Sequence, residues 1–171
     1  MKAVTYSEYA PDDNYAKILK VQDIDDPKPK ADEVVFEVKS AALNYNDIWG
    51  MRGQPVPVPL PHVSGSDAAG DVIAVGDDVK NIKVGDKVVS HSNMSCRVCK
   101  ACTDGREFDC IKRTIWGFQT GPNWGAFQEV THLPEVNVSK IPEGVSYDDA
   151  AAASMTILTS WHMLVGRAKI T

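Results

Sequence analysis

All four cysteines of this 171-residue chain lie within fifteen consecutive positions, in the segment SCRVCKACTDGREFDC. Their spacing, C-x2-C-x2-C-x7-C, corresponds to Cys96, Cys99, Cys102 and Cys110. Because a C-x2-C turn presents two thiolates to the same side, four such sulfurs can converge on one tetrahedral metal ion. Free cysteines or local disulfides would not explain why every cysteine lies here. We expect one zinc ion per chain, with iron held by four thiolates as the main rival.

This zinc site should be structural, because four protein ligands leave no coordination position open for a substrate. A reducing compartment favours such metal thiolates over disulfides. The N-terminus MKAVTYSEYAPDD lacks the apolar core of a signal peptide, and no apolar stretch approaches the ~20 residues that span a bilayer. The net charge of -5 argues against a nucleic-acid surface. We therefore expect a cytoplasmic protein that binds neither membrane nor nucleic acid.

Short strands separated by Gly, Pro and Asp turns occupy most of the chain before residue 135. The expected strands lie at 1–6, 33–43, 68–79, 83–91 and 125–133, the last one closed by a proline. Such closely spaced strands are typical of a β-barrel or sandwich and not of βαβ units. The sequence therefore predicts a mainly β domain.

The sequence pattern becomes typical of a helix near the C-terminus. Ser146 is a suitable N-cap, and the acidic residues 148–149 complement the helix dipole. Apolar residues follow at helical density up to Gly166, where we expect the helix to end. Hydroxyl residues within 154–159 could mark a break between two helices. No G-x-G-x-x-G phosphate turn occurs anywhere in the sequence.

The strand-rich beginning, the cysteine spacing and the turn motifs together resemble the medium-chain dehydrogenase/reductase superfamily. The resemblance implies that residues 1–171 form its GroES-like catalytic domain, a β-barrel with a structural-zinc lobe at 92–113. It also implies that the helical segment 146–171 leads to a Rossmann domain that is absent from this chain. The full enzyme would bind NAD(P)H there and associate as a homo-oligomer.

The zinc alcohol dehydrogenases of this superfamily also hold a catalytic zinc. Its ligands are a Cys in a C-x-[ST]-D turn, the His of G-H-E, and a Cys or Asp before a Thr-x-Tyr/Trp helix. The corresponding positions here are Asn44, Ser66 and Met155. An amide, an alcohol and a thioether do not hold Zn²⁺, which binds thiolate, imidazole or carboxylate. We therefore expect no catalytic zinc.

Four motifs resemble the zinc-free quinone and enoyl reductase branch, and crotonyl-CoA carboxylase/reductases in particular. They are NYNDIW (44–49), GSDAAG (65–70), IWGFQT (115–120) and GAF (125–127). This resemblance implies NAD(P)H-dependent reduction of an activated C=C bond in a 2-enoyl-CoA, an enone or a quinone. Carboxylating members carry an acidic residue where this chain has Gln119, so plain reduction is favoured over carbon dioxide fixation.

The resemblance also assigns roles to individual residues. Asn44 and Asn46 would line the pocket and hydrogen-bond the substrate carbonyl or a water, although Asn also suits tight turns for purely structural reasons. Asp47, the third residue of the candidate catalytic group, is expected to hold the turn together. Asp67 is expected to be a structural carboxylate satisfied by backbone donors.

Other candidates border the expected pocket. Phe118 and Gln119 would bind the acyl group, although an aromatic beside Trp116 packs equally well in a core. Thr159 would approach the nicotinamide, or bond to the preceding helical turn. His91 ends a strand near the pocket, and no histidine shows metal-ligand spacing.

Two other functions remain open from the residues. One is a zinc-dependent alcohol dehydrogenase, which would need two zinc ions per chain. The other is a non-enzymatic, zinc-bearing interaction module. The substrate is expected to be a small molecule. The sequence does not choose between NADH and NADPH, because the residues that read the ribose phosphate would lie in the further domain.

Overall fold

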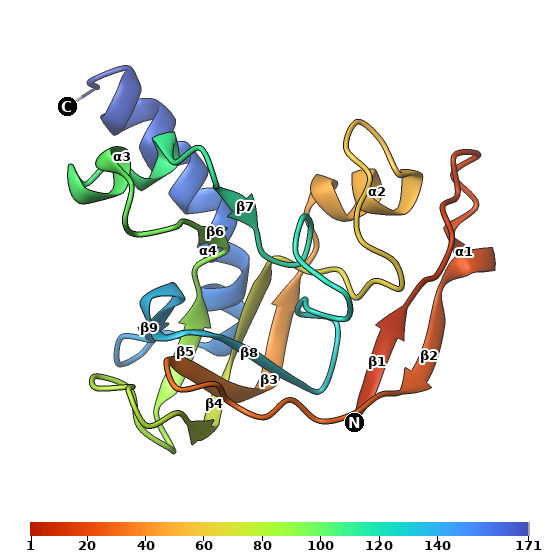
Figure 1. Ribbon diagram of the computed structural model, residues 1–171, viewed down its shortest axis with the longest axis horizontal. Helices are drawn as coiled ribbons and strands as arrows, with labels where there is room; N and C mark the ends of the chain where they lie inside the picture. Colours follow the sequence, from red (N-terminus) through yellow and green to blue (C-terminus); the bar gives the residue numbers. More distant parts are fainter. Residues whose placement is uncertain (171) are drawn as a thin grey trace.

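A curled antiparallel sheet forms the centre of the computed structural model, which describes residues 1–170 (Figure 1). Its strand order is β8-β3-β4-β5-β9. The strand bounds are Glu33–Ala42 for β3, Asp67–Val75 for β4, Lys87–Ser90 for β5, Val130–Pro134 for β8 and Val138–Lys140 for β9. The predicted mainly β architecture is confirmed, with the sheet closing half of a barrel.

The sheet curls around a core of branched and aromatic side chains. Val34, Phe36, Val88 and Leu133 are fully buried inside it, together with Trp116. Register shifts in the β3–β4 pair add twist, as bulges do, and bend the sheet towards closure. Burial of these side chains supplies the main driving force for folding.

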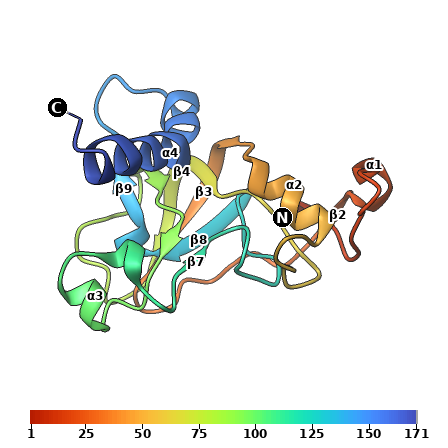
Figure 2. The same ribbon diagram turned by 90° about the horizontal axis from the view of Figure 1, so that it is seen from above.

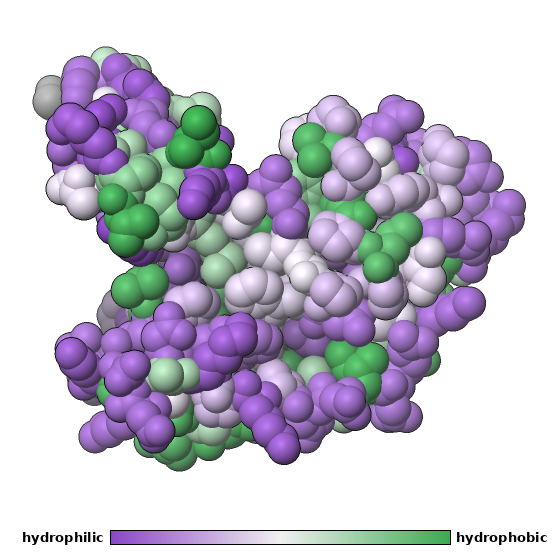
Figure 3. Space-filling view, in the orientation of Figure 1, coloured by the Kyte–Doolittle hydropathy of each residue, from purple (hydrophilic) through white to green (hydrophobic). Residues whose placement is uncertain are grey.

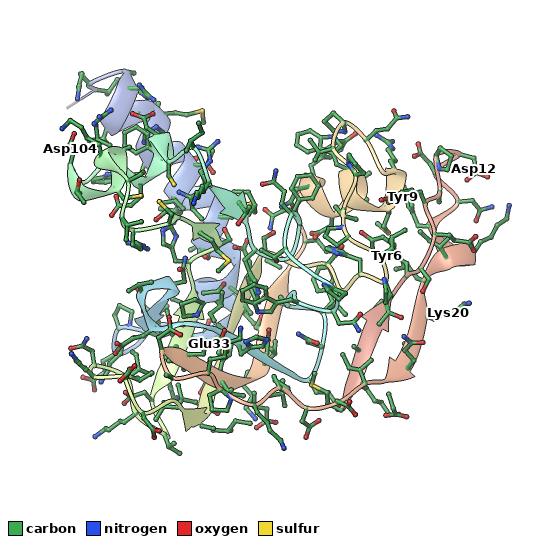
Figure 4. All side chains as sticks on the ribbon, viewed as in Figure 1. Tyr6, Tyr9, Asp12, Lys20, Glu33 and Asp104 are labelled. Atoms are coloured by element: carbon green, nitrogen blue, oxygen red, sulfur yellow. The ribbon has the colours of Figure 1, made fainter. Side chains whose placement is uncertain are left out.

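The β3–β4 pair also positions the end of the sheet where α2 begins. Ala42, the last residue of β3, pairs with Asp67, the first residue of β4. Because α2 (Tyr45–Arg52) starts three residues after β3 ends, its first turn lies directly beside the start of β4. Through Met51, α2 packs on a second cluster that includes Tyr6, while Tyr9 lies against this cluster. Figure 4 labels Tyr9 at the end of this helix and Tyr6 below it.

Smaller elements complete the described chain. They are β1 (Lys2–Thr5) paired with β2 (Lys20–Asp23), β6 (Asn93–Met94) paired with β7 (Thr114–Ile115), α1 (Tyr15–Ile18), α3 (Lys100–Thr103), and the 3₁₀ turns η1 (Glu107–Asp109) and η2 (Glu135–Asn137). We call residues 92–113, which carry α3 and η1, the cysteine lobe. In Figure 1 the cysteine lobe and α2 stand on opposite sides above the sheet.

The C-terminal helix α4 runs from Tyr147 to Trp161 and continues as a π-helical segment, η3 (His162–Arg167). Ser146 caps it, as predicted, by accepting a hydrogen bond from the Asp149 N–H at 3.0 Å. Its alanines Ala150 and Ala151 pack on Ala69 of β4, so α4 covers that part of the sheet (Figure 2).

Two expectations about this helix were wrong. There is no break within 154–159, because the hydroxyls there bond to nearby carbonyls without interrupting the helix. Ser154 Oγ donates to Ser90 O at 2.6 Å, and Thr156 Oγ1 donates to Ala152 O at 2.7 Å. Gly166 does not end the helix either, since η3 extends through it to Arg167.

The strand expected over 125–133 was also misplaced, since β8 begins only at Val130. The preceding backbone pairs elsewhere: the N–H groups of Ala126 and Phe127 donate to the carbonyls of Gly65 and Ser64. This contact ties the segment to the loop before β4. Among the described helices, none is long and apolar enough to cross a membrane.

Candidate functional site

A pocket of about 610 Å³ lies between α2, α4 and the cysteine lobe. Figure 3 shows the molecule hollowed between the two projections that these elements form. Its size is within the range of small-molecule sites in proteins. Much of its lining is apolar, including Trp49, Phe118 and Leu158. This pocket gathers several of the residues singled out in the sequence.

Asn46 is the predicted catalytic residue with the clearest place in this pocket. It lies in the first turn of α2, lines the pocket and is 9% exposed. Its Nδ2 donates to the Ser66 hydroxyl at 2.8 Å. Within residues 1–170 its Oδ1 has no hydrogen-bond partner. A buried amide end without a partner is costly, so this atom is suited to meet a ligand.

Asn44 and Asp47 hold the start of α2 and do not line the pocket. The Asp47 carboxylate accepts from the Asn44 N–H at 2.8 Å and from the Gly65 N–H at 2.9 Å. Gly65 has φ +102°, and a Cβ there would meet Ala126 Cβ at 2.7 Å, so only glycine fits this turn. Burial raises the pKa of Asp47 to about 6. Its contacts join the start of α2 to the loop before β4, and the turn-holding role stays a prediction.

Asp67 lies where the three expected ligand positions converge. Its carboxylate accepts from Asn44 Nδ2 at 2.8 Å and from the Met155 N–H at 3.0 Å. Ser66 precedes it and is fully buried. Burial raises the pKa of Asp67, while these donors favour its ionised form. These contacts join α2, β4 and α4, and one of the two donors is a side-chain amide where the sequence led us to expect backbone donors; the structural role stays a prediction.

The remaining predicted residues divide between the pocket and its surroundings. Phe118 and Thr159 line the pocket. Gln119 does not line the pocket. Its Oε1 accepts a hydrogen bond from the Ile115 N–H at 3.0 Å, which closes a local turn. His91 lines the pocket, and burial lowers its pKa, so the ring is neutral near pH 7.

Sequence reasoning missed one wall of the pocket, which the cysteine lobe supplies. Arg97, Glu107, Phe108 and Arg113 line it. These residues lie between or just after the cysteines in sequence, and we read that segment only for its sulfurs. The signal that could have revealed them is the number of charged residues in a segment expected to fold around one ion.

The cysteine cluster fits a tetrahedral metal ion. All four Sγ atoms lie within 4.8 Å of one another. Cys96 and Cys102 Sγ are 3.9 Å apart, and the Cys99–Cys102 and Cys96–Cys110 sulfur pairs are each 3.5 Å apart. A zinc ion bound at Zn–S distances of about 2.3 Å separates its sulfurs by about 3.8 Å. The geometry therefore matches the size of a tetrathiolate zinc site.

The surroundings favour thiolate at one of these sulfurs. The backbone N–H groups of Val98 and Cys99 lower the pKa of Cys96 to about 6. Within residues 1–170, no other group of three or more His, Cys, Asp or Glu side chains has a geometry that could hold a metal ion. The groups around Asp67 differ from the cysteine cluster, because they are hydrogen-bond donors to a single carboxylate and not ligands for a metal ion.

Comparison with known families gives one match of direct relevance. Residues 30–143 match the family described as the alcohol dehydrogenase GroES-like domain. The match includes β3, α2, β4 and the whole cysteine lobe. The predicted GroES-like fold is thereby confirmed.

Individual relatives come from several branches. The chain is 35% identical over 154 residues to crotonyl-CoA carboxylase/reductase of Cereibacter sphaeroides, which covers 86% of this chain and 35% of that protein. A crystal structure of an NAD-dependent alcohol dehydrogenase is 37% identical, with a TM-score of 0.89, over 98% of this chain and 47% of that one. A quinone oxidoreductase of Pseudomonas syringae is 31% identical, with a TM-score of 0.70, over 95% of this chain and 40% of that one. The chain thus spans less than half the length of each.

Proposed function

Since the chain belongs to the alcohol dehydrogenase GroES-like domain family of medium-chain dehydrogenases and reductases, we propose that it is the substrate domain of an NAD(P)H-dependent reductase. The proposed reaction is reduction of a C=C bond conjugated to a carbonyl, as in an enone, a quinone or a 2-enoyl thioester. The proposed enzyme works without a catalytic zinc ion.

The network around Asp67 is the observation that carries this proposal. At the three positions where zinc alcohol dehydrogenases would supply ligands, this chain has Asn44, Ser66 and Met155. Two of these residues donate hydrogen bonds to Asp67. Hydrogen bonds to the buried Asp67 carboxylate organise this part of the structure. The side chains at the three positions offer no thiolate or imidazole to a cation.

Asn46 is the group that we assign to the substrate carbonyl. A half-turn about its terminal torsion exchanges the two ends of the amide. The Ser66 hydroxyl then donates to Oδ1, and Nδ2 turns its N–H groups towards the position that Oδ1 now occupies. Negative charge gathers on the carbonyl oxygen as hydride reaches the β-carbon, and N–H donors at that oxygen stabilise the transition state.

The residues of the pocket also fit a nicotinamide ring. Trp49, Phe118 and Leu158 provide apolar surface, and Thr159 provides a hydroxyl for a carboxamide. The cofactor, when bound, supplies the hydride. The roles that we propose for the protein residues are to hold the two reactants together and to exclude water.

The cysteine lobe, residues 92–113, is proposed to hold one structural zinc ion through Cys96, Cys99, Cys102 and Cys110. A reducing compartment such as the cytoplasm keeps these thiols free to bind it. We further propose that residues 146–171 connect this domain to the cofactor-binding domain in the full protein.

The test is to assay the full-length protein with NADPH and with NADH against crotonyl-CoA, a quinone and an alcohol paired with the oxidised cofactor. We expect turnover of at least one of the two unsaturated carbonyl substrates and none of the alcohol. Turnover of the alcohol alone would refute the proposal.

A zinc alcohol dehydrogenase is the second candidate, because the 37% identical structure is named an NAD-dependent alcohol dehydrogenase. Metal analysis separates the two functions. The reductase should contain one zinc per chain, bound in the cysteine lobe, whereas the alcohol dehydrogenase needs two. Mass spectrometry of the native protein counts the ions directly.

A further inference from the structure

The wall of the pocket formed by the cysteine lobe has no role in the chemistry proposed above. It places three ionisable side chains, Arg97, Glu107 and Arg113, beside a largely apolar cavity. Arg97 and Arg113 are exposed and Glu107 is half-buried, so water reaches both guanidinium groups. The question is which of these charges is compensated within the protein.

Arg97 and Glu107 compensate each other. Arg97 Nη1 lies 3.4 Å from Glu107 Oε1, and its Nη2 donates to the Val136 carbonyl at 3.5 Å. His91, the neighbouring ring in the pocket, is half-buried, and this burial lowers its pKa, so it adds no charge near pH 7. The paired groups together contribute no net charge to the wall.

Arg113 is left with a full positive charge. Its Nη1 donates to the Phe108 carbonyl at 2.6 Å, and across residues 1–170 it forms no ion pair with a carboxylate. A guanidinium carries five N–H donors in a planar fork that matches a carboxylate or a phosphate. Several of these donors therefore stay available at the mouth of the pocket.

Neighbouring aromatic contacts fix where this guanidinium lies. Phe108, whose carbonyl holds Arg113, packs against the His162 ring of η3 with centroids 4.5 Å apart. The Arg167 guanidinium carbon lies over the Phe108 ring, 5.1 Å from its centroid. These contacts anchor η1 to η3, so Arg113 is held on the wall opposite Asn46 and α2.

We propose that Arg113 forms an anion subsite of the pocket, which selects substrates that carry a carboxylate or phosphate group apart from their reacting double bond. This inference rests on the proposed function, because it names the substrate class for the same pocket. A cavity of about 610 Å³ has room for both the reacting group and a charged one.

The experiment uses the full-length protein and two matched substrate pairs. One pair is a carboxylate-bearing enone and its methyl ester; the other is crotonyl-CoA and crotonyl-N-acetylcysteamine. We expect Arg113→Gln to raise KM about tenfold for a charged member, as loss of a charge-assisted hydrogen bond does, while kcat and the neutral members stay unchanged. A response to the carboxylate alone or to the phosphate-bearing thioester alone identifies the natural anion, and either result supports the subsite.

Two further variants serve as controls. Arg106→Gln removes the same charge from the cysteine lobe, but Arg106 pairs with Asp104 and Asp109 outside the pocket, at the end of the lobe where Figure 4 labels Asp104. This variant should leave every KM unchanged. Glu107→Gln frees Arg97 from its ion pair and should lower KM for the charged substrates severalfold.

A binding measurement keeps the inference testable without turnover. Butyryl-CoA and butyryl-N-acetylcysteamine, which cannot be reduced, are titrated calorimetrically into the wild type and Arg113→Gln. The inference is overturned if the variant binds both analogues as the wild type does, if KM changes equally for charged and neutral substrates, or if only the cofactor KM changes. Turnover of the neutral enone would still support the proposed function in each of these cases.

Discussion

Asn46 and Asp47 are neighbours in the first turn of α2, yet their side chains enter different surroundings. Asn46 lies in the pocket with one amide end unpaired, whereas Asp47 turns inward and accepts two backbone N–H groups. Helical geometry explains the difference, because consecutive side chains point about 100° apart around the axis. One residue is therefore available for chemistry, and the next fixes the helix that carries it.

Asn46→Asp tests the role of the amide as a donor. At pH 8 an ionised carboxylate beside the developing negative charge should lower kcat by a factor of about 100 or more. Activity should partly return as the pH falls through the raised pKa of the new carboxyl, because its protonated form can donate. Steady-state kinetics of the full-length protein from pH 5 to 8 measure this.

The matched control is Asn93→Asp, which introduces the same charge into the same pocket. If both variants lose activity equally, the effect is a general one of charge and the donor role of Asn46 is contradicted.

Asp47→Asn should change how stability depends on pH. Burial raises the pKa of Asp47 from 3.8 to about 6, so the folded state binds this proton more tightly than the unfolded state. The free energy of unfolding therefore falls as the pH rises from about 4 to about 6, by roughly 3 kcal/mol for a shift of about two units. Urea unfolding at several pH values should show the wild type losing this amount relative to the variant.

Asp148→Asn, at the exposed start of α4, is the control and should give a curve parallel to that of the wild type. Parallel curves for Asp47→Asn as well would show that the buried carboxyl does not titrate in this range.

At the scale of elements, the cysteine lobe stands out because its parts are too short to hold themselves together. α3 has four residues and η1 has three. Val98 and Ile111 point outward, being 80% and 92% exposed, and the half-buried Met94 and Phe108 pack on the sheet core and on η3, outside the lobe. Cys102 and Cys110 are buried. The lobe thus lacks a hydrophobic core of its own, and metal coordination is the interaction that can replace one.

Removal of the metal by a chelator should unfold this lobe and leave the sheet intact. Hydrogen exchange followed by mass spectrometry should show loss of protection in residues 92–113, with no change in β3 and β4. Addition of Zn²⁺ should restore the protection. Uniform loss across the chain, or no loss at all, would contradict a local structural role for the ion.

At the scale of the whole molecule, the pocket depends on elements far apart in sequence. α2 lies before residue 53, the cysteine lobe is centred near residue 103, and α4 begins at Tyr147. The α4–η3 face carries exposed apolar side chains, including Leu158, Trp161 and Leu164. The pocket and this face lie side by side, since Leu158 belongs to both.

Residues 1–171 alone should bind NADPH only weakly. A dinucleotide phosphate binds well at a glycine-rich turn before a helix N-terminus, and this sequence contains no such turn. The first turn of α4 carries Asp148 and Asp149, which repel phosphate. Titration calorimetry should detect no binding below millimolar concentrations, with the full-length protein as the positive control. A low-micromolar affinity of residues 1–171 would contradict this expectation.

Local patterns were enough to predict several of the elements, including three strands of the central sheet. Strand alternation located β1, β3, β4 and β5, and Ser146 with its acidic neighbours located the start of α4. One prediction was wrong because a polar side chain had a tertiary partner. Ser154 looked like a helix breaker, but its hydroxyl bonds to Ser90 O across the α4–β5 contact. No local pattern contains that partner.

The sequence by itself determined the chemistry that is available: four thiols at metal-binding spacing, and an amide, an alcohol and a thioether where a second metal would need ligands. These follow from residue identity, which folding does not change. Only the tertiary structure decided which groups face the pocket, since that depends on contacts between distant segments. It directed Asn44 to Asp67 and left Asn46 in the cavity, and it turned the charged side chains of the cysteine lobe into a wall opposite α2.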